Sequence, residues 1–253
     1  MIASSAILET IQSPADLKRL STVELAKLAG EIRDELVSSV TKTGGHLSSN
    51  LGVVELTIGL HTVFDSPRDI MIWDVGHQAY VHKLLTGRKD AFHTMRQQHG
   101  LAPFCAREES PHDAFGAGHA GTSLSAALGM AVARDMRGED HHVIAVIGDG
   151  AMTCGMPFEA MNNAGTYGKR LIVILNDNDM SISPNVGALS RYLSRRRANP
   201  DYARRATDQY YMLAKIAPDG TVNGFVMPTM WEELGFIYTG PVDGHDLPSV
   251  IEA

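Results

Sequence analysis

Two short polar segments carry the side chains best suited to bind a metal ion. Gly148-Asp149-Gly150 ends an apolar run, and Asn176-Asp177-Asn178 ends the next apolar run along the chain. Asp149 offers a charged oxygen and Asn178 a neutral amide oxygen, and neither has a Cys or His beside it. Mg²⁺ prefers an octahedral shell of oxygens and commonly shares it with substrate phosphates. The segments therefore predict a site for Mg²⁺ bound to a diphosphate, which the glycines allow the backbone to approach closely.

This site can form only if both segments lie at the same edge of a sheet. The apolar runs before them, residues 143–147 and 171–175, are rich in Val and Ile and do not alternate, which is typical of strands buried on both faces of a parallel sheet. A helical pattern at 157–164 lies between them. Because strand–helix–strand units are almost always right-handed parallel crossovers, Asp149 and Asn178 are predicted to leave the sheet at its carboxyl edge, where ligands bind.

Ordinary turn chemistry is the alternative interpretation, since Gly, Asp and Asn are favoured in loops that follow strands. Either segment alone would be explained in this way. The two together, each directly after a buried-strand pattern and with the spacing from Asp149 to Asn178, resemble the metal- and diphosphate-binding motif of thiamine-diphosphate enzymes.

The surrounding residues narrow the resemblance to the 1-deoxy-D-xylulose 5-phosphate synthase family. The chain resembles that family, in the same order, over blocks that cover residues 45–52, 73–80, 118–123, 147–165, 175–183 and 240–246. The resemblance runs from about residue 14 to the last residue. It implies an α/β three-layer sandwich in which a mainly parallel sheet is flanked by helices. Residues 1–253 would form a single domain that binds the diphosphate side of thiamine diphosphate.

Carried over position by position, the resemblance also implies the ligands of the cofactor. Magnesium would be held by Asp149, Asn178 and the carbonyl oxygen of Met180. The diphosphate would be contacted by a set of small residues, an amide and two histidines: Gly118, His119, Ala120, Gly150, Ala151, Asn178 and His77. His46 would face the reacting carbon, where family members use a histidine for proton transfer and substrate orientation, and His77 would share the catalytic role.

Physical chemistry supports several of these roles independently. The turn at 118–121 runs into an apolar-periodic segment at 124–136, so its N–H groups are predicted to lie at a helix N-terminus, where phosphate is favoured. Histidine exchanges protons near neutral pH. Residues 116–121 also satisfy the dinucleotide fingerprint G-x-G-x-x-G. That fingerprint should directly follow a buried strand, whereas polar residues 112–113 come shortly before this one, so a nicotinamide or flavin site is not expected.

The composition indicates a soluble, cytoplasmic enzyme or part of one. With 253 residues and 44% hydrophobic content the chain can bury a substantial core, and a net charge of -7 argues against a nucleic-acid partner. Arg residues at 195–197 and 204–205 lack interleaved aromatics and are typical of a solvated loop. Cys105 and Cys154 predict neither a disulfide scaffold nor a zinc site. Uninterrupted apolar segments fall short of the roughly 18 residues that span a bilayer, so no membrane partner is expected.

Other elements are predicted from periodicity and caps. Ser21 and Glu24 form a capping box ahead of a helix that leads to the His46 turn, a second helix covers 53–64, and a strand covers 70–73. A polar, His-rich connection then precedes the helix after Thr122. From 190 to 230 the pattern weakens and predicts a mobile excursion or lid.

The chain also departs from the family in places. That excursion is poorly matched, Ala120 and Gly121 stand where serines are common, and Asp179 stands where glutamate is usual. None of these differences removes the expected metal ligands.

The resemblance implies a reaction and a partner as well. A full-length synthase condenses pyruvate with glyceraldehyde 3-phosphate with loss of CO₂. This chain is expected to need a pyrimidine-side domain that it does not contain, and a second chain is the expected partner that carries it. A split enzyme and a truncated chain both fit that expectation, as does homo- or hetero-oligomerisation. The alternatives are the amino-terminal subunit of a split transketolase and a noncatalytic relic that binds a cofactor or a partner.

Overall fold

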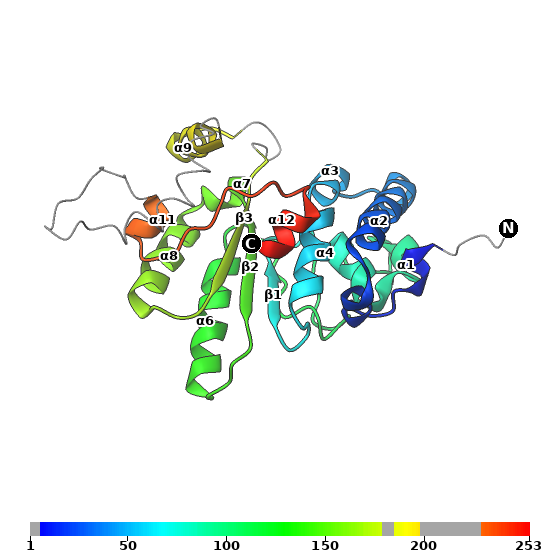
Figure 1. Cartoon of the computed structure of the whole chain (residues 1–253), viewed down its shortest axis with the longest axis horizontal. Coiled ribbons are helices and arrows are strands. Elements are labelled where there is room, and N and C mark those ends of the chain that lie inside the picture. Colours follow the sequence, from blue (N-terminus) through cyan, green and yellow to red (C-terminus); the bar gives the residue numbers. More distant parts are fainter. Residues whose placement is uncertain (1–5, 179–184, 198–228) are drawn as a thin grey trace, which may run out of the picture.

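A parallel β-sheet forms the centre of the protein. Its structure is a computed structural model that describes residues 6–178, 185–197 and 229–253 (Figure 1). Within these residues the sheet has the order β1-β2-β3, with β1 at Ile70–Trp73, β2 at Val143–Gly148 and β3 at Ile172–Asn176. Both pairs are parallel, and Gly148 lies opposite Asn176. The predicted strands and their parallel pairing are therefore confirmed.

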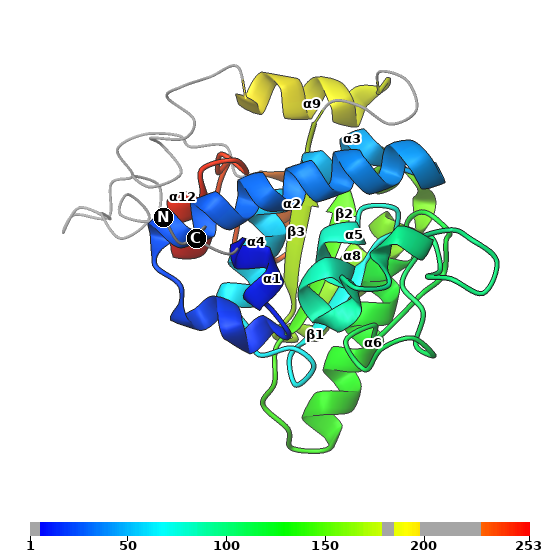
Figure 2. The same ribbon diagram turned by 90° about the vertical axis from the view of Figure 1, so that its right-hand side faces the viewer.

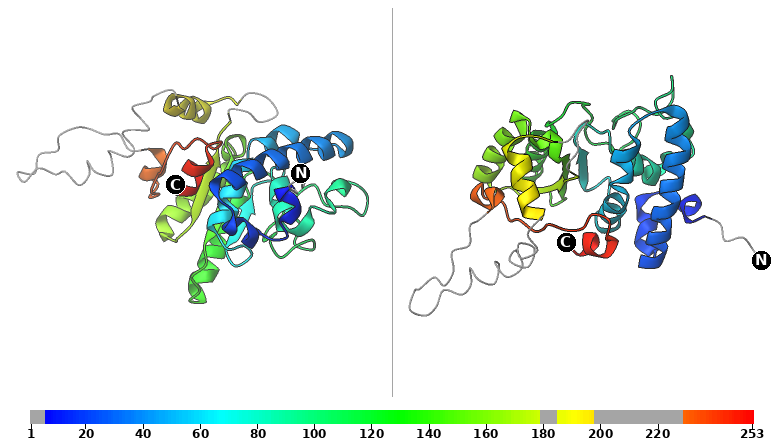
Figure 3. Two further views of the ribbon diagram at one scale, coloured as in Figure 1. Left: turned by 45° about the vertical axis from the view of Figure 1, so that its right-hand side comes forward. Right: turned by 90° about the horizontal axis from the view of Figure 1, so that it is seen from above.

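Helices cover both faces of this sheet, as the view from above in Figure 3 shows. Successive side chains of a β-strand point to opposite faces of the sheet, so β1 and β2 each contribute side chains to both faces. One face packs on Leu60 of α4 (Val54–Val63) through Met71, Trp73, Ile144 and Val146. The other packs on α6 (Ser123–Met136) and α8 (Gly155–Tyr167) through Ile72, Val143, Ala145 and Ile147. The expected three-layer α/β architecture is confirmed.

An outer helix completes the layer on the α4 side. Helix α2 (Thr22–Thr43) crosses this side of the molecule in Figure 2. It begins at Ser21, whose hydroxyl accepts the Glu24 N–H, so the predicted capping box is present. The helix buries one apolar stripe at helical spacing: Leu25, Leu28, Ile32, Leu36 and Val40. Short elements pack around it, namely α1 (Ile7–Thr10), η1 (Pro14–Arg19) and α3 (Leu47–Leu51).

The connection between β1 and α6 contains more regular structure than its sequence predicts. It includes α5 (Tyr80–Lys83), η2 (Leu84–Arg88) and η3 (Phe92–Thr94). The spacing of apolar residues does not predict these short helices, because they bury polar side chains. His82 and Lys83, for example, have no exposed surface. The G-x-G-x-x-G sequence at 116–121 lies in a loop of this connection. As expected, it does not directly follow a strand.

The remaining helices follow β2 and β3. They are α7 (Asp149–Met152), α9 (Ala188–Arg197), α11 (Met230–Glu233) and α12 (Leu247–Glu252). The segment predicted as an excursion begins within α9, and its residues 198–228 lie outside the described residues, so that prediction stays open. α12 packs closely on α4, where a Cβ added to Gly59 would lie 2.7 Å from Val250 Cγ1. Among the described helices none combines the length and apolar character that crossing a bilayer requires.

Candidate active site

Asp149 and the end of β3 meet at the carboxyl edge of the sheet. Asp149 follows β2 directly, begins α7 and is 4% exposed. The register that places Gly148 opposite Asn176 brings the Asp177 side chain into hydrogen-bonding contact with the Asp149 carboxyl group. Asn185 Nδ2 donates to Asp149 Oδ2 at 2.7 Å. The two polar segments singled out in the sequence are therefore adjacent in space.

The electrostatics of this pair suit a cation. Burial raises the pKa of Asp149 to about 6, and the neighbouring Asp177 carboxylate contributes in the same direction. Two carboxylates in contact repel when both are ionised, and a divalent ion between them would remove that repulsion. Carboxylate oxygens are hard ligands of the kind that Mg²⁺ prefers, and Asn178, which follows Asp177 in the sequence, would add a carboxamide oxygen. The residues present thus fit a magnesium ion, while Met180, the third predicted ligand, lies outside the described residues.

This pKa shift predicts an unusual pH dependence of stability for the metal-free chain. The folded-state pKa of Asp149 lies above the unfolded value of about 3.9, so this group's contribution falls as the pH rises from about 4 to about 6, by about 2–3 kcal/mol. Asp149→Asn should therefore be more stable than the parent at pH 7 in EDTA, and nearly equal at pH 4. Urea unfolding at both pH values checks this. A parent-to-variant difference that does not change with pH would contradict it.

The predicted phosphate turn lies where expected, but the helix N-terminus behind it is already occupied. Asp74, directly after β1 and 1% exposed, accepts the N–H groups of Gly121 at 2.8 Å and Ser123 at 3.0 Å. A buried carboxylate therefore satisfies the start of α6, and the expectation that these N–H groups serve a phosphate is wrong for Gly121. Gly118, with a φ of 71°, donates to the Val75 carbonyl at 3.2 Å. The N–H group of Gly118 is therefore also taken, and the cofactor contacts of Gly118, His119 and Ala120 stay a prediction.

The two candidate catalytic histidines lie next to each other. The His46 and His77 rings meet edge to face, with centroids 5.5 Å apart. His77 Nδ1 is buried without a hydrogen-bond partner in the described part of the chain, which suits a ligand contact. Burial lowers the pKa of both rings, with Arg96 adding to the effect at His46 and His46 adding to it at His77. Both imidazoles are thus held neutral near pH 7, as a proton acceptor requires.

A hydrogen bond between side chains links the turn that carries His77 to the end of β3, next to the proposed metal site. Asn176 Nδ2, at the end of β3, donates to Gln78 Oε1 at 3.1 Å. Phe104 closes the opposite side, since its ring lies 6.4 Å from the His46 ring between centroids and a Cβ added to Gly118 would lie 3.2 Å from Phe104 Cε2. The fold therefore gathers the described candidate residues around one sheet edge. Sequence patterns did not indicate Phe104, because a lone aromatic residue in a loop carries no periodic signal.

The connection between β1 and α6 also contains a buried ionic network that the sequence did not predict. Asp113 is saturated: His82 Nε2 and Arg88 Nη2 donate to Oδ1 at 3.1 and 2.8 Å, and Arg88 Nη1 and the Ala106 N–H donate to Oδ2 at 2.7 and 2.8 Å. His82 Nδ1 in turn lies 2.9 Å from His61 Nε2.

Cys105 completes a group of potential metal ligands with His82 and Asp113, whose ligand atoms lie within 4.8 Å of one another. Asp113 has no lone pair left for an ion, and burial raises the pKa of the Cys105 thiol to about 12. The hydrogen bonds that fill the Asp113 carboxylate are those of a structural ionic network.

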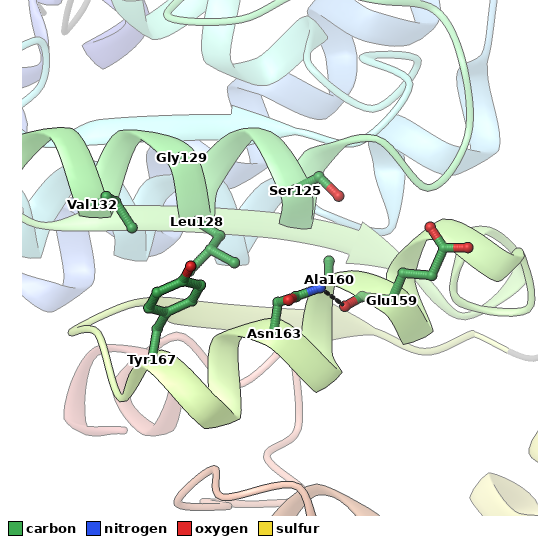
Figure 4. A pocket seen from close by; sticks show the side chains of 8 residues that line it. All are labelled: Ser125, Leu128, Gly129, Val132, Glu159, Ala160, Asn163 and Tyr167. Atoms are coloured by element: carbon green, nitrogen blue, oxygen red, sulfur yellow. Dashed lines mark hydrogen bonds between the residues drawn. The ribbon is translucent and has the colours of Figure 1, made fainter.

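A separate hollow of about 390 Å³ lies between α6 and α8 (Figure 4). It is lined by small, apolar and polar side chains of the two helices: Ser125, Leu128, Gly129, Val132, Glu159, Ala160, Asn163 and Tyr167. Asn163 Nδ2 donates to the Glu159 carbonyl oxygen at 2.8 Å within α8. None of the candidate site residues lines it, so this groove is not the predicted cofactor site.

Comparison with known proteins identifies close relatives. The family described as 1-deoxy-D-xylulose-5-phosphate synthase matches residues 8–253. The synthase of Thermomicrobium roseum is 59% identical over 97% of this chain and 41% of its own length. Those of Dehalococcoides mccartyi and Chromobacterium violaceum are 56% and 54% identical, over 96% and 97% of this chain and 40% and 41% of their own lengths. The chain thus spans about two-fifths of the length of these relatives.

One solved structure supports the fold. A transketolase mutant from Pichia stipitis matches with a TM-score of 0.63 at 19% identity, covering 92% of this chain and 34% of the transketolase chain. At this identity the likeness concerns the fold alone.

Proposed function

Because the chain belongs to the 1-deoxy-D-xylulose-5-phosphate synthase family, we propose that it binds the diphosphate and the magnesium ion of thiamine diphosphate. The observation that carries this proposal is the buried Asp149 carboxylate in contact with Asp177 at the ends of two neighbouring parallel strands. Such a pair of acidic groups is disfavoured without a cation and favoured with one. Its place at the carboxyl edge of the sheet agrees with the usual position of ligands in α/β folds.

The candidate residues divide into three roles. Asp149, Asn178 and the Met180 carbonyl hold the metal ion. Gly150 and Ala151 in α7, the turn of Gly118, His119 and Ala120, and His77 contact the diphosphate. His46 and His77, kept neutral by their surroundings, accept and return protons at the reacting centre. Thiamine diphosphate, when bound, supplies the electron sink, while the protein supplies position and electrostatics.

We further propose that the reaction joins pyruvate to glyceraldehyde 3-phosphate with loss of CO₂, in the cytoplasm. The residues given span about two-fifths of the length of these relatives, so the reaction is proposed for an assembly that also contains a pyrimidine-side domain, on the same polypeptide or on a second chain. Within such an assembly the present chain is the part that orients the diphosphate and faces the reacting carbon with His46.

Two measurements test this proposal. Calorimetry should detect binding of thiamine diphosphate to the 253-residue chain that requires Mg²⁺ and is reversed by EDTA. Absence of binding with millimolar Mg²⁺ would contradict the cofactor assignment. With a pyrimidine-side chain from a relative added, pyruvate labelled at its carboxyl carbon should release labelled CO₂. A mixture that transfers ketol units between sugar phosphates and releases no CO₂ would instead indicate a transketolase.

A further inference from the structure

One buried side chain ties the two candidate catalytic histidines together. Asn50 in α3 has no exposed surface. Its Nδ2 donates to the carbonyl oxygen of His46 at 2.6 Å and to that of His77 at 2.8 Å. Its Oδ1 accepts the backbone N–H of Tyr80 at 2.9 Å. A single carboxamide therefore joins the turn before α3, the turn after β1 and the start of α5.

The chemistry of these three contacts selects a carboxamide. Asn and Gln are the neutral side chains that offer two N–H donors and a carbonyl acceptor in one plane. A carboxylate at position 50 would face two carbonyl oxygens with acceptor atoms, and a serine would supply one donor only. Asn50 bonds segments 27 and 30 positions away along the chain, so its contacts join distant segments and do more than cap its own helix.

Close packing limits how far the His46 and His77 turns can move apart or approach each other. Gly45 has a φ of 140°, and a Cβ added there would lie 2.7 Å from the Tyr80 hydroxyl oxygen, so the His46 turn packs directly on α5. On the other side, a Cβ added to Gly76 would lie 3.1 Å from Phe104 Cβ. Close backbone packing fixes how near the turns approach, and the Asn50 hydrogen bonds fix their relative orientation.

We propose that Asn50 is a positioning residue, whose carboxamide locks the His46 turn against the His77 turn and so sets the relation of the two imidazoles toward the cofactor. It acts through backbone groups and does not itself touch a ligand. This inference rests on the proposed function, because the roles of His46 and His77 are part of that function.

The test compares Asn50→Ala and Asn50→Ser with a matched control, Thr57→Val. Thr57 is also fully buried, and its hydroxyl donates to the Val53 carbonyl oxygen at 2.6 Å, a hydrogen bond that stays at the start of α4 and joins neither histidine turn. The control thus loses a buried hydrogen bond without loosening the site. The primary readout is NMR titration of the His46 and His77 rings in the cofactor-free chain, and the second is calorimetry with thiamine diphosphate and Mg²⁺.

In the parent, burial is the main cause of the low pKa of His77, and the neighbouring His46 lowers that pKa further. Asn50→Ala should raise the pKa of His77 and make the two titrations independent, because the rings are no longer held together. The other charged or titratable groups that face these rings, Asp74, Arg96 and Tyr80, are unchanged in every variant. Cofactor affinity should fall about tenfold, Asn50→Ser should lie between Asn50→Ala and the parent, and Thr57→Val should match the parent in both readouts.

Parent-like titrations in both Asn50 variants would overturn the proposal. So would an equal change in Thr57→Val, since a general loss of stability would then explain it. If Asn50→Ala does not fold, Asn50→Ser, which retains one donor, decides the same question. If the parent itself binds no thiamine diphosphate, the proposed function fails while the titrations still decide whether Asn50 couples the two histidines.

Discussion

Replacing Asp149 by alanine is expected to weaken Mg²⁺-dependent binding of thiamine diphosphate by at least about 100-fold, since even outer-shell partners of metal ligands contribute about 10- to 100-fold. Asp149 is the buried carboxylate at the end of the central strand and the strongest ligand of the proposed site. The loss should appear in calorimetry as a raised dissociation constant for the cofactor at fixed Mg²⁺.

A surface substitution separates this effect from a general change of charge. Asp140→Ala removes a carboxylate that is 82% exposed and paired with Arg68, so cofactor affinity should stay within about twofold of the parent, as expected for an exposed pair. Asp149→Asn keeps the shape of the side chain and should also lose most of the affinity, because it removes the charge. If Asp149→Ala binds the cofactor as well as the parent does, the metal site lies elsewhere.

Replacing Asp113 by alanine should cost about 3–5 kcal/mol of unfolding free energy, because the buried Arg88 guanidinium loses its bidentate carboxylate. The guanidinium keeps Glu109 Oε2, at 3.4 Å, and the Thr86 hydroxyl. Asp113 has no exposed side-chain surface, and Arg88 is 7% exposed. Burial alone would raise the pKa of Asp113, but the hydrogen bonds from His82 and Arg88 outweigh it and hold that pKa well below its usual range. This stabilisation is present above the unfolded pKa of about 3.9 and is lost as the pH falls below it.

Urea unfolding of the variant beside the parent measures this loss at pH 7. Asp140→Ala again provides the control, with an expected change below about 1 kcal/mol because exposed ion pairs contribute little. Asp113→Asn should fall between the two, since it keeps the volume and loses the charge. A loss below about 1 kcal/mol for Asp113→Ala would show that Glu109 and Thr86 suffice to compensate the buried Arg88 guanidinium.

Local patterns in the sequence were sufficient to predict the strands that end at the proposed metal ligands. Residues 143–147 and 171–175 predicted two buried parallel strands, and both are present within one residue of the expected bounds. Ser21 and Glu24 predicted the start of α2, and the structure contains that cap. These predictions succeeded because continuous Val- and Ile-rich runs and capping boxes are short-range patterns whose physical cause lies within a few residues.

The contacts between distant segments had no such signal. Asn50 joins the His46 turn, the His77 turn and the start of α5. Asp74 accepts N–H groups at the start of α6, and Asp113 accepts hydrogen bonds from His82, Arg88 and the Ala106 N–H. Each is a polar side chain that the sequence alone assigns most simply to a surface or a turn. Burial among specific backbone groups gives it a role, and burial depends on the packing of the whole chain.

The sequence by itself determined the α/β class, the parallel strands and the placement of Asp149 at a sheet edge, because strand burial and crossover handedness follow from local pattern and chain chirality. Only the tertiary structure decided that Asp177 contacts Asp149, that Asp74 and not a phosphate occupies the N–H groups of Gly121 and Ser123, and that the two histidines share one buried amide. Hydrogen bonds and charge pairs act over a few ångströms in space, and separation along the chain does not encode that distance.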